Sequence, residues 1–126
     1  MKNTVNIGII GLGFGKNYLL TFNMLENANV KWICARRMST ISKALADAKN
    51  KSNINTTTNY KDILEDNNVD AVAIVTPGST HYMLAREALL AGKHVIVEKP
   101  VAFKSKEVMD LISISKKRKK ILMAGH

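Results

Sequence analysis

Three short motifs contain the residues of this chain that could do chemistry together. They are a glycine-rich stretch at residues 11–15, a Thr-Pro pair at residues 76–77 and a Glu-Lys-Pro triplet at residues 98–100. Each follows an apolar run with the character of a β-strand. The strands of an open parallel sheet present their carboxyl ends at one edge, and ligands bind there. The spacing therefore predicts that the three motifs meet in one site, which fits a nicotinamide dinucleotide.

The glycine stretch joins the first predicted strand to the first predicted helix. Glycine permits a tight turn and a close approach of backbone N–H groups to a pyrophosphate, and the helix N-terminus adds a favourable dipole. The usual spacing is G-x-G-x-x-G, and this loop is one residue shorter. An ordinary glycine-rich turn is the alternative, but the position after a first strand favours binding. The predicted cofactor-binding residues of the loop are Gly11, Gly13, Phe14 and Gly15.

Two arginines follow the second predicted strand, where an acidic residue normally holds the adenosine ribose of NAD. The chain has Arg36 and Arg37 at this point, with no Asp or Glu beside them. A carboxylate would repel a 2′-phosphate, whereas an arginine can pair with it through two hydrogen bonds and can stack on the adenine. We therefore expect NADP, with NAD as the alternative. Two arginines that simply face solvent after a strand would look the same in sequence.

The Thr-Pro pair ends the fourth predicted strand. Pro77 turns the chain away from the sheet because its ring fixes φ, which would leave the Thr76 hydroxyl facing the cleft. Ser79 or Thr80 is expected to cap the next helix. His81 lies in the first turn of that helix, where a histidine is more often a surface or capping residue than a catalytic one.

The Glu-Lys-Pro triplet ends the fifth predicted strand. At a buried edge, Lys99 could hold a substrate oxygen, stabilise a developing alkoxide or act as a base. Glu98 could orient it as an ion-pair partner. A surface Glu–Lys pair before a turn is the alternative, but the neighbouring Thr76-Pro77 motif favours a site. Lys99 is the predicted catalytic residue, and Thr76, Pro77, His81, Glu98, Lys99 and Pro100 are predicted to bind cofactor.

Strands and helices alternate along the chain. Strands are predicted over Thr4–Ile10, Val30–Ala35, part of Asn53–Thr58 (a short edge strand), Ala71–Val75, His94–Glu98 and Lys120–Ala124. Helices are predicted over Lys16–Asn27, Ser39–Lys49, Tyr60–Asp66, Thr80–Ala91 and Lys104–Lys117, the last with Val108, Leu111 and Ile112 facing inward. This alternation predicts an α/β fold: a doubly wound, Rossmann-type parallel sheet of about six strands with helices on both faces.

Composition limits the class of protein. The 126 residues suffice for one domain, and 46% hydrophobic residues suffice for a core. No stretch reaches the roughly 18 apolar residues of a membrane span. The single cysteine, Cys34, cannot form an internal disulfide and offers no metal cluster. A reducing, cytoplasmic location fits best, and we expect neither a metal nor a membrane partner.

The chain is strongly basic, with a formal net charge of +9. The densest basic run, residues 116–120, falls where a helix should end, and cations stabilise helix C-termini. No aromatic side chains interrupt this run to stack on bases. We therefore expect a solvated helix end and regard nucleic-acid binding as improbable.

Taken together, these motifs resemble those of the glucose–fructose oxidoreductase and inositol dehydrogenase family (Gfo/Idh/MocA). The resemblance runs over essentially the whole chain. It is strongest in the segment 69–77, VDAVAIVTP, with His81, and in the segment 88–100, ALLAGKHVIVEKP. It implies that Lys99 contacts substrate and nicotinamide, and that a cis peptide often precedes the proline at position 100.

The resemblance also implies the domain organisation. Residues 1–126 would be the dinucleotide-binding domain, and the family's C-terminal domain, which forms most of the substrate pocket and drives oligomerisation, lies outside this chain. The complete protein would transfer hydride between the cofactor and a hydroxyl-bearing carbon of a sugar, a cyclitol or a similar polyol, as a homo-oligomer. The alternative is a non-catalytic dinucleotide-binding module or redox sensor that acts through a protein partner. We expect the isolated chain to bind cofactor with little or no turnover.

Overall fold

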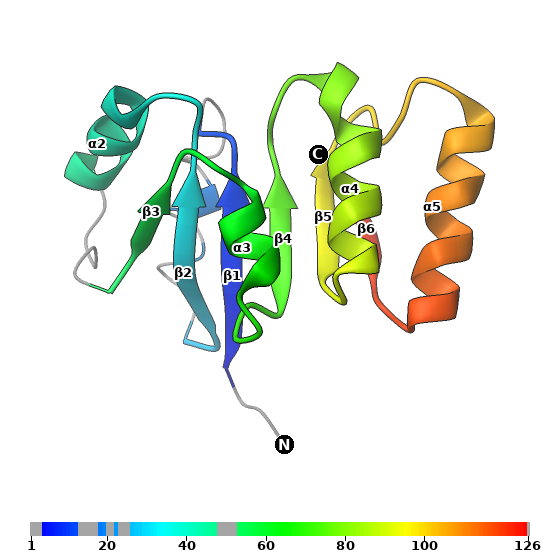
Figure 1. Cartoon of the computed structure of the whole chain (residues 1–126), viewed down its shortest axis with the longest axis horizontal. Helices are drawn as coiled ribbons and strands as arrows, with labels where there is room; N and C mark the ends of the chain where they lie inside the picture. The colour runs from blue at the N-terminus through cyan, green and yellow to red at the C-terminus, as the bar shows by residue number, and fades with distance from the viewer. Residues whose placement is uncertain (1–3, 13–17, 20–21, 23–25, 48–52, 126) are drawn as a thin grey trace.

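A computed structural model describes residues 4–12, 18–19, 22, 26–47 and 53–125. Its centre is one six-stranded parallel sheet in the spatial order β3-β2-β1-β4-β5-β6 (Figure 1). The strands are β1 (Val5–Ile10), β2 (Ala28–Cys34), β3 (Asn55–Thr57), β4 (Ala71–Ile74), β5 (His94–Glu98) and β6 (Leu122–Gly125). This order is that of a Rossmann fold, so the predicted fold class is confirmed.

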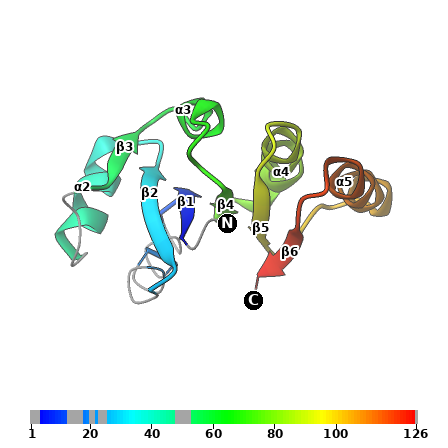
Figure 2. The same ribbon diagram turned by 90° about the horizontal axis from the view of Figure 1, so that it is seen from below.

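Helices cover both faces of the sheet. The helices are α2 (Met38–Asp47), α3 (Lys61–Glu65), α4 (His81–Leu90) and α5 (Ser105–Arg118), with a 3-10 turn, η1 (Gly78–Thr80), before α4. Figure 2 shows α3, α4 and α5 on one side of the strands. The other side is covered by α2 and by helical residues in the segment that follows the glycine loop, among them Leu19.

The core consists of two hydrophobic clusters, one on each face. Alternate residues of β4 serve the two clusters: Val72 and Ile74 join the α4–α5 side, and Ala71 and Ala73 join the α2 side. All four are buried, as the unbroken apolar run of this strand predicts. β4 is therefore central to the sheet, and it fixes the position of the Thr76-Pro77 segment that follows its carboxyl end.

The last helix differs from its prediction in one inward position. Leu111 and Ile114 are buried, whereas Ile112 is 41% exposed. A step of three residues keeps a side chain on nearly the same face of a helix, and a single step turns it by about 100°. The helix ends at Arg118 and is followed by Lys119, whose φ of 55° is left-handed, and the basic run occupies this exposed end as expected.

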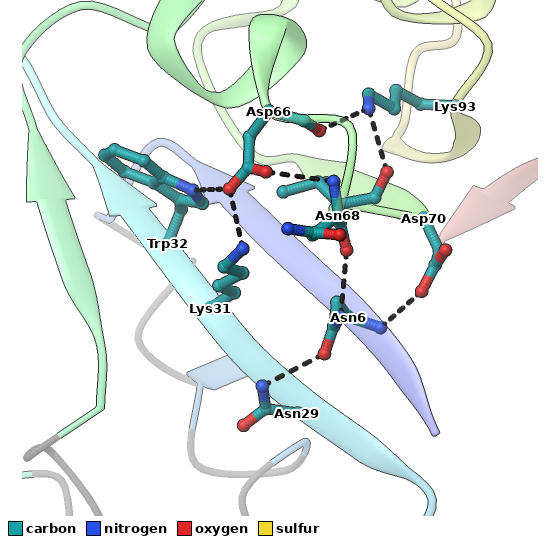
Figure 3. A network of polar contacts seen from close by, with 9 residues as sticks. Asn6, Asn29, Lys31, Trp32, Asp66, Asn68, Asp70 and Lys93 are labelled. Carbon is teal, nitrogen blue, oxygen red and sulfur yellow. Dashed lines mark hydrogen bonds and ion pairs between the residues drawn. The ribbon is translucent and has the colours of Figure 1, made fainter. Parts of the chain in front are cut away.

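A polar network joins the amino ends of the strands, at the edge opposite the predicted site (Figure 3). The Asp66 carboxylate accepts a hydrogen bond from Trp32 Nε1 at 2.8 Å and pairs with Lys31 Nζ at 2.9 Å. These partners lower the pKa of Asp66 to about 2. Lys93 is buried, and its ammonium donates to the carbonyl oxygens of Asp66 at 2.7 Å and Val69 at 2.8 Å. The network anchors the loop before β4.

The described part of the chain contains no group of three or more His, Cys, Asp or Glu side chains that could hold a metal ion. Among the same residues, no helix has the length and apolar character to span a membrane.

Candidate functional site

The three motifs meet at one edge of the sheet. β1 lies between β2 and β4, so the chain winds one way from β1 to β2 and β3 and the other way from β4 to β6. This reversal is the topological switch point at which doubly wound sheets bind ligands. The loops after β1, β4 and β5 all leave from this edge, at the top of Figure 1.

Gly11 has a conformation and a packing that only glycine fits. Its φ is +96°, and a Cβ added to it would lie 2.7 Å from the carbonyl carbon and oxygen of Val75. Its N–H donates to the carbonyl of Cys34 at 2.8 Å. The first glycine of the motif thus packs its backbone directly against the end of β4. The other predicted residues of the loop, Gly13, Phe14 and Gly15, lie outside the described residues.

The loop after β4 is held by hydroxyl groups. The Thr80 hydroxyl donates to the carbonyl of Pro77 at 2.6 Å and lies 2.6 Å from the Thr76 hydroxyl. Thr80 has one hydroxyl proton, so Thr76 is the donor between the two hydroxyls and retains its acceptor lone pairs. The expected side-chain cap on α4 is absent at Thr80, because its hydroxyl is engaged with Pro77 instead.

The loops after β4 and β5 pack against each other. A Cβ on Gly78 would lie 3.1 Å from Cδ of Pro100 and 3.3 Å from the ring of Phe103. The Lys99–Pro100 peptide is cis, as the family resemblance implies. Phe103 is otherwise exposed, so this loop presents an aromatic ring at the site edge.

His81 lies behind these loops and is fully buried, at 1% exposure. Its Nδ1 is 2.7 Å from the carbonyl oxygen of Pro100, and its Nε2 is 2.7 Å from the carbonyl oxygen of Thr76. The interpretation of His81 as a surface or capping residue is wrong, because the ring turns inward from the first residue of α4. With both nitrogens engaged by backbone, its ring supports the site from behind.

Glu98 has a partner that sequence reasoning missed. The Tyr18 hydroxyl donates a hydrogen bond to Oε1 of Glu98. Burial, this hydrogen bond and the Glu98 charge raise the pKa of Tyr18 to about 12. Tyr18 also packs against Phe22, four residues on, with ring centroids 5.9 Å apart. The available signal was this i, i+4 spacing, because it places Tyr18 and Phe22 on the same face of the predicted helix.

The Lys99 side chain is exposed to solvent and forms no ion pair with Glu98. Successive residues of a strand point to opposite sides, so an ion pair between neighbours at a strand end is disfavoured. Glu98 is half-buried against Tyr18, whereas Lys99 is exposed at the edge. The buried environment expected for Lys99 is therefore not present among the described residues. Its ammonium is accessible to a ligand at the switch point.

Arg36 and Arg37 occupy the bend between β2 and α2, and both are exposed. The bend leaves from the same sheet edge as Gly11, because β1 and β2 are parallel neighbours. The structure thus brings two guanidinium groups to the carboxyl edge of the sheet, with no acidic residue within the bend. Pro77 is also exposed there, while Thr76 is half-buried.

Comparison with known proteins identifies the family. The model of the GFO_IDH_MocA family, described as an oxidoreductase family with an NAD-binding Rossmann fold, matches residues 5–126. The uncharacterized oxidoreductase YrbE of Bacillus subtilis (strain 168) is 32% identical over 126 residues, which cover 99% of this chain and 36% of that protein. A glycosyl hydrolase family 109 protein of Shewanella sp. (strain ANA-3) is 34% identical over 119 residues, covering 86% of this chain and 25% of the relative.

Solved structures share the fold. A mutant of a 3-ketoreductase from Actinomadura kijaniata, in complex with TDP-benzene and NADP, is 25% identical with a TM-score of 0.86. The match covers 98% of this chain and 38% of that one. The chain thus spans a quarter to two fifths of the length of these relatives, and it matches their nucleotide-binding part.

Proposed function

This chain belongs to the oxidoreductase family with an NAD-binding Rossmann fold, and on that premise we propose that the carboxyl edge of its sheet holds NADP. The site would serve hydride transfer between the nicotinamide and a hydroxyl-bearing carbon of a sugar, a cyclitol or a similar polyol. Binding of a nicotinamide dinucleotide is common to the family. The phosphorylated form and the substrate class are the parts that this proposal adds.

The observation that supports the site best is the packing of Gly11. Its left-handed φ and the 2.7 Å approach of a hypothetical Cβ to Val75 describe a position that admits no side chain, at the start of the predicted turn. Such a turn lets main-chain N–H groups approach a pyrophosphate at the switch point. The residues present therefore fit the diphosphate of a dinucleotide.

Arg36 and Arg37 support the preference for NADP. They are exposed at the end of β2, where the adenosine ribose of a bound dinucleotide lies in this fold. A guanidinium can donate two hydrogen bonds to a 2′-phosphate. The same bend contains no carboxylate to accept hydrogen bonds from the ribose hydroxyls of NAD.

Lys99 and Thr76 would act at the reacting end. When bound, the cofactor supplies the nicotinamide that accepts or donates hydride. The exposed Lys99 ammonium can hold the substrate oxygen and stabilise negative charge that develops on it. The Thr76 hydroxyl donates its hydrogen bond to the Thr80 hydroxyl, so its oxygen can accept a hydrogen bond from a nicotinamide amide. Two named activities among the similar proteins, glycosyl hydrolase and 3-ketoreductase, are compatible with a carbohydrate substrate.

The test is a fluorescence titration of the purified chain with NADPH and NADH in parallel. We expect NADPH to bind more tightly. The double variant Arg36→Ala, Arg37→Ala should weaken NADPH binding by roughly tenfold or more and leave NADH binding nearly unchanged, because only NADPH has a 2′-phosphate. The double variant Lys117→Ala, Arg118→Ala, at the exposed end of α5, also removes two positive charges and is the matched control for net charge.

The titration tests two parts of the proposal separately: the dinucleotide site itself and the preference for NADPH. Tighter binding of NADH would keep the site and remove the role of the two arginines in choosing the cofactor. Failure of both cofactors to bind would refute the dinucleotide site in this chain.

A further inference from the structure

The two nitrogens of the His81 ring face the same kind of group. Both lie 2.7 Å from backbone carbonyl oxygens, Pro100 on one side and Thr76 on the other. A carbonyl oxygen can only accept, and a neutral imidazole has a single N–H. If the ring were neutral, one nitrogen lone pair would face a carbonyl lone pair at hydrogen-bond distance. Two good contacts require a proton on each nitrogen.

His94, at the amino end of β5, provides a contrast within the same chain. The backbone N–H of Ile121 donates to Nδ1 of His94 at 3.0 Å. Nδ1 of His94 therefore has no proton, and its ring is the neutral tautomer with the proton on Nε2. Burial and the nearby Lys120 charge also lower the pKa of His94. The structure thus gives the two rings opposite hydrogen-bonding roles.

We propose that His81 is an imidazolium and a positioning residue, a donor on both sides that holds the loops after β4 and β5 in the arrangement that receives the nicotinamide end of the cofactor. This inference rests on the proposed function for its ligand and on geometry alone for its proton count. It assigns no contact between His81 and substrate, since the ring is buried.

The position of the two carbonyls explains why this support matters. Thr76 follows β4 and Pro100 follows β5, so neither carbonyl belongs to the sheet ladder. His81 is 1% exposed, so water has little access to the two carbonyl groups, and the ring serves as their hydrogen-bond partner. The carbonyl of Pro100 comes directly after Lys99, and the carbonyl of Thr76 belongs to the residue whose hydroxyl is proposed to accept a hydrogen bond from the nicotinamide amide. The same ring therefore sets the separation of the two residues proposed to act at the reacting end.

The proton count is tested by NMR of the histidine side-chain nitrogens in the ligand-free chain near neutral pH. We expect both nitrogens of His81 to have bound protons, whereas His94 shows one protonated and one unprotonated nitrogen. The signals of His81 are assigned by their loss in His81→Asn. One unprotonated nitrogen in His81 would overturn the imidazolium. This result does not depend on whether a cofactor binds.

The positioning role is tested with two ligands that differ only at the reacting end: NADPH and 2′-phospho-ADP-ribose, which keeps both riboses and the diphosphate but lacks the nicotinamide. In His81→Asn we expect roughly tenfold weaker binding of NADPH and a change of less than about twofold for the fragment. The side chain of His81→Gln also has only one donor nitrogen, so this variant should show the same changes in the two affinities. His94→Asn should leave both affinities unchanged.

Two results would overturn this role. Equal weakening of both ligands in the His81 variants would mean that the ring only stabilises the fold. Unchanged binding of both would mean that the loops keep their arrangement without it. If the wild-type chain binds neither ligand, the proposed function fails together with the positioning role, and the NMR result still decides the proton count.

Discussion

The hydroxyl of Tyr18 donates a hydrogen bond to Oε1 of Glu98, and this contact links the helical segment after the glycine loop to the carboxyl end of β5. The two residues are 80 positions apart in the chain. Gly125, at the end of β6, lies directly beside them, and a Cβ added to it would come 3.1 Å from Oε1 of Glu98 and would overlap the Tyr18 hydroxyl. The helical segment after β1 therefore meets the carboxyl ends of β5 and β6 around one hydrogen bond.

Removing the hydroxyl should reveal its contribution. Tyr18→Phe is expected to lower the free energy of unfolding by about 1 kcal/mol, because a half-buried carboxylate loses its donor. The pKa of Tyr18 is about 12 in the fold and 10.0 as its ordinary value, so its contribution is present below pH 10 and is lost as the pH rises towards 12. Urea unfolding at neutral and alkaline pH measures both effects. An unchanged midpoint at neutral pH would show that the bond contributes nothing.

Gly125→Ala should be costly only while the Tyr18 hydroxyl is present. The new methyl group would displace that hydroxyl and strain the contact with Glu98. In the Tyr18→Phe background the methyl has more room, so we expect a smaller loss of stability there. A double-mutant cycle by urea unfolding measures the coupling. Strictly additive effects of the two substitutions would contradict this packing.

The two described glycines with positive φ should respond differently to alanine. Gly11 has a φ of +96° and backbone atoms 2.7 Å from the position of a Cβ, whereas Gly92 has a φ of +84° and no atom within 4 Å. Gly92→Ala should cost only the left-handed strain, about 1 kcal/mol. Gly11→Ala should cost about 3 kcal/mol or more, because strain and overlap add. Equal losses in thermal or urea unfolding would exclude the close approach to Val75.

His94 should make a contribution to stability that is lost as the solution becomes mildly acidic. Its pKa in the fold is lowered from 6.5 by burial and by Lys120. The unfolded chain then binds more protons, so the contribution of His94 is full above pH 6.5 and decreases as the pH falls below it. His94→Asn should flatten this part of the stability profile. A profile identical to that of the wild type would assign the loss to other groups.

Lys93 should matter more than Lys31, although both lie beside Asp66. Lys93→Met leaves two carbonyl groups of the loop before β4 without their donor, and we expect a loss of about 2 kcal/mol or more. Lys31→Met removes a partly exposed ion pair and should cost less than about 1 kcal/mol. Urea unfolding of the two variants ranks them. A larger loss of stability in Lys31→Met than in Lys93→Met would show that the ion pair stabilises the network more than the buried ammonium does.

Local patterns were sufficient to predict the fold and the edge of the sheet at which the three motifs meet. The unbroken apolar run of β4, the alternation of strand and helix and the glycine at the first turn each reflect a short-range requirement of backbone or burial. Strand ends follow from such patterns, and parallel strands place their ends at one edge. The meeting of Gly11, Thr76 and Lys99 at the switch point could therefore be predicted without coordinates.

The partners of the side chains were decided only by the tertiary structure. Nothing in a local pattern states that Tyr18 reaches Glu98, that His81 turns inward to Thr76 and Pro100, or that Ile114 is buried in place of Ile112. These contacts depend on how far two strand ends and a helix are separated in space, and on the rotation of a helix about its axis. Sequence determines which groups need burial or a partner, and the packed fold determines which groups come within reach.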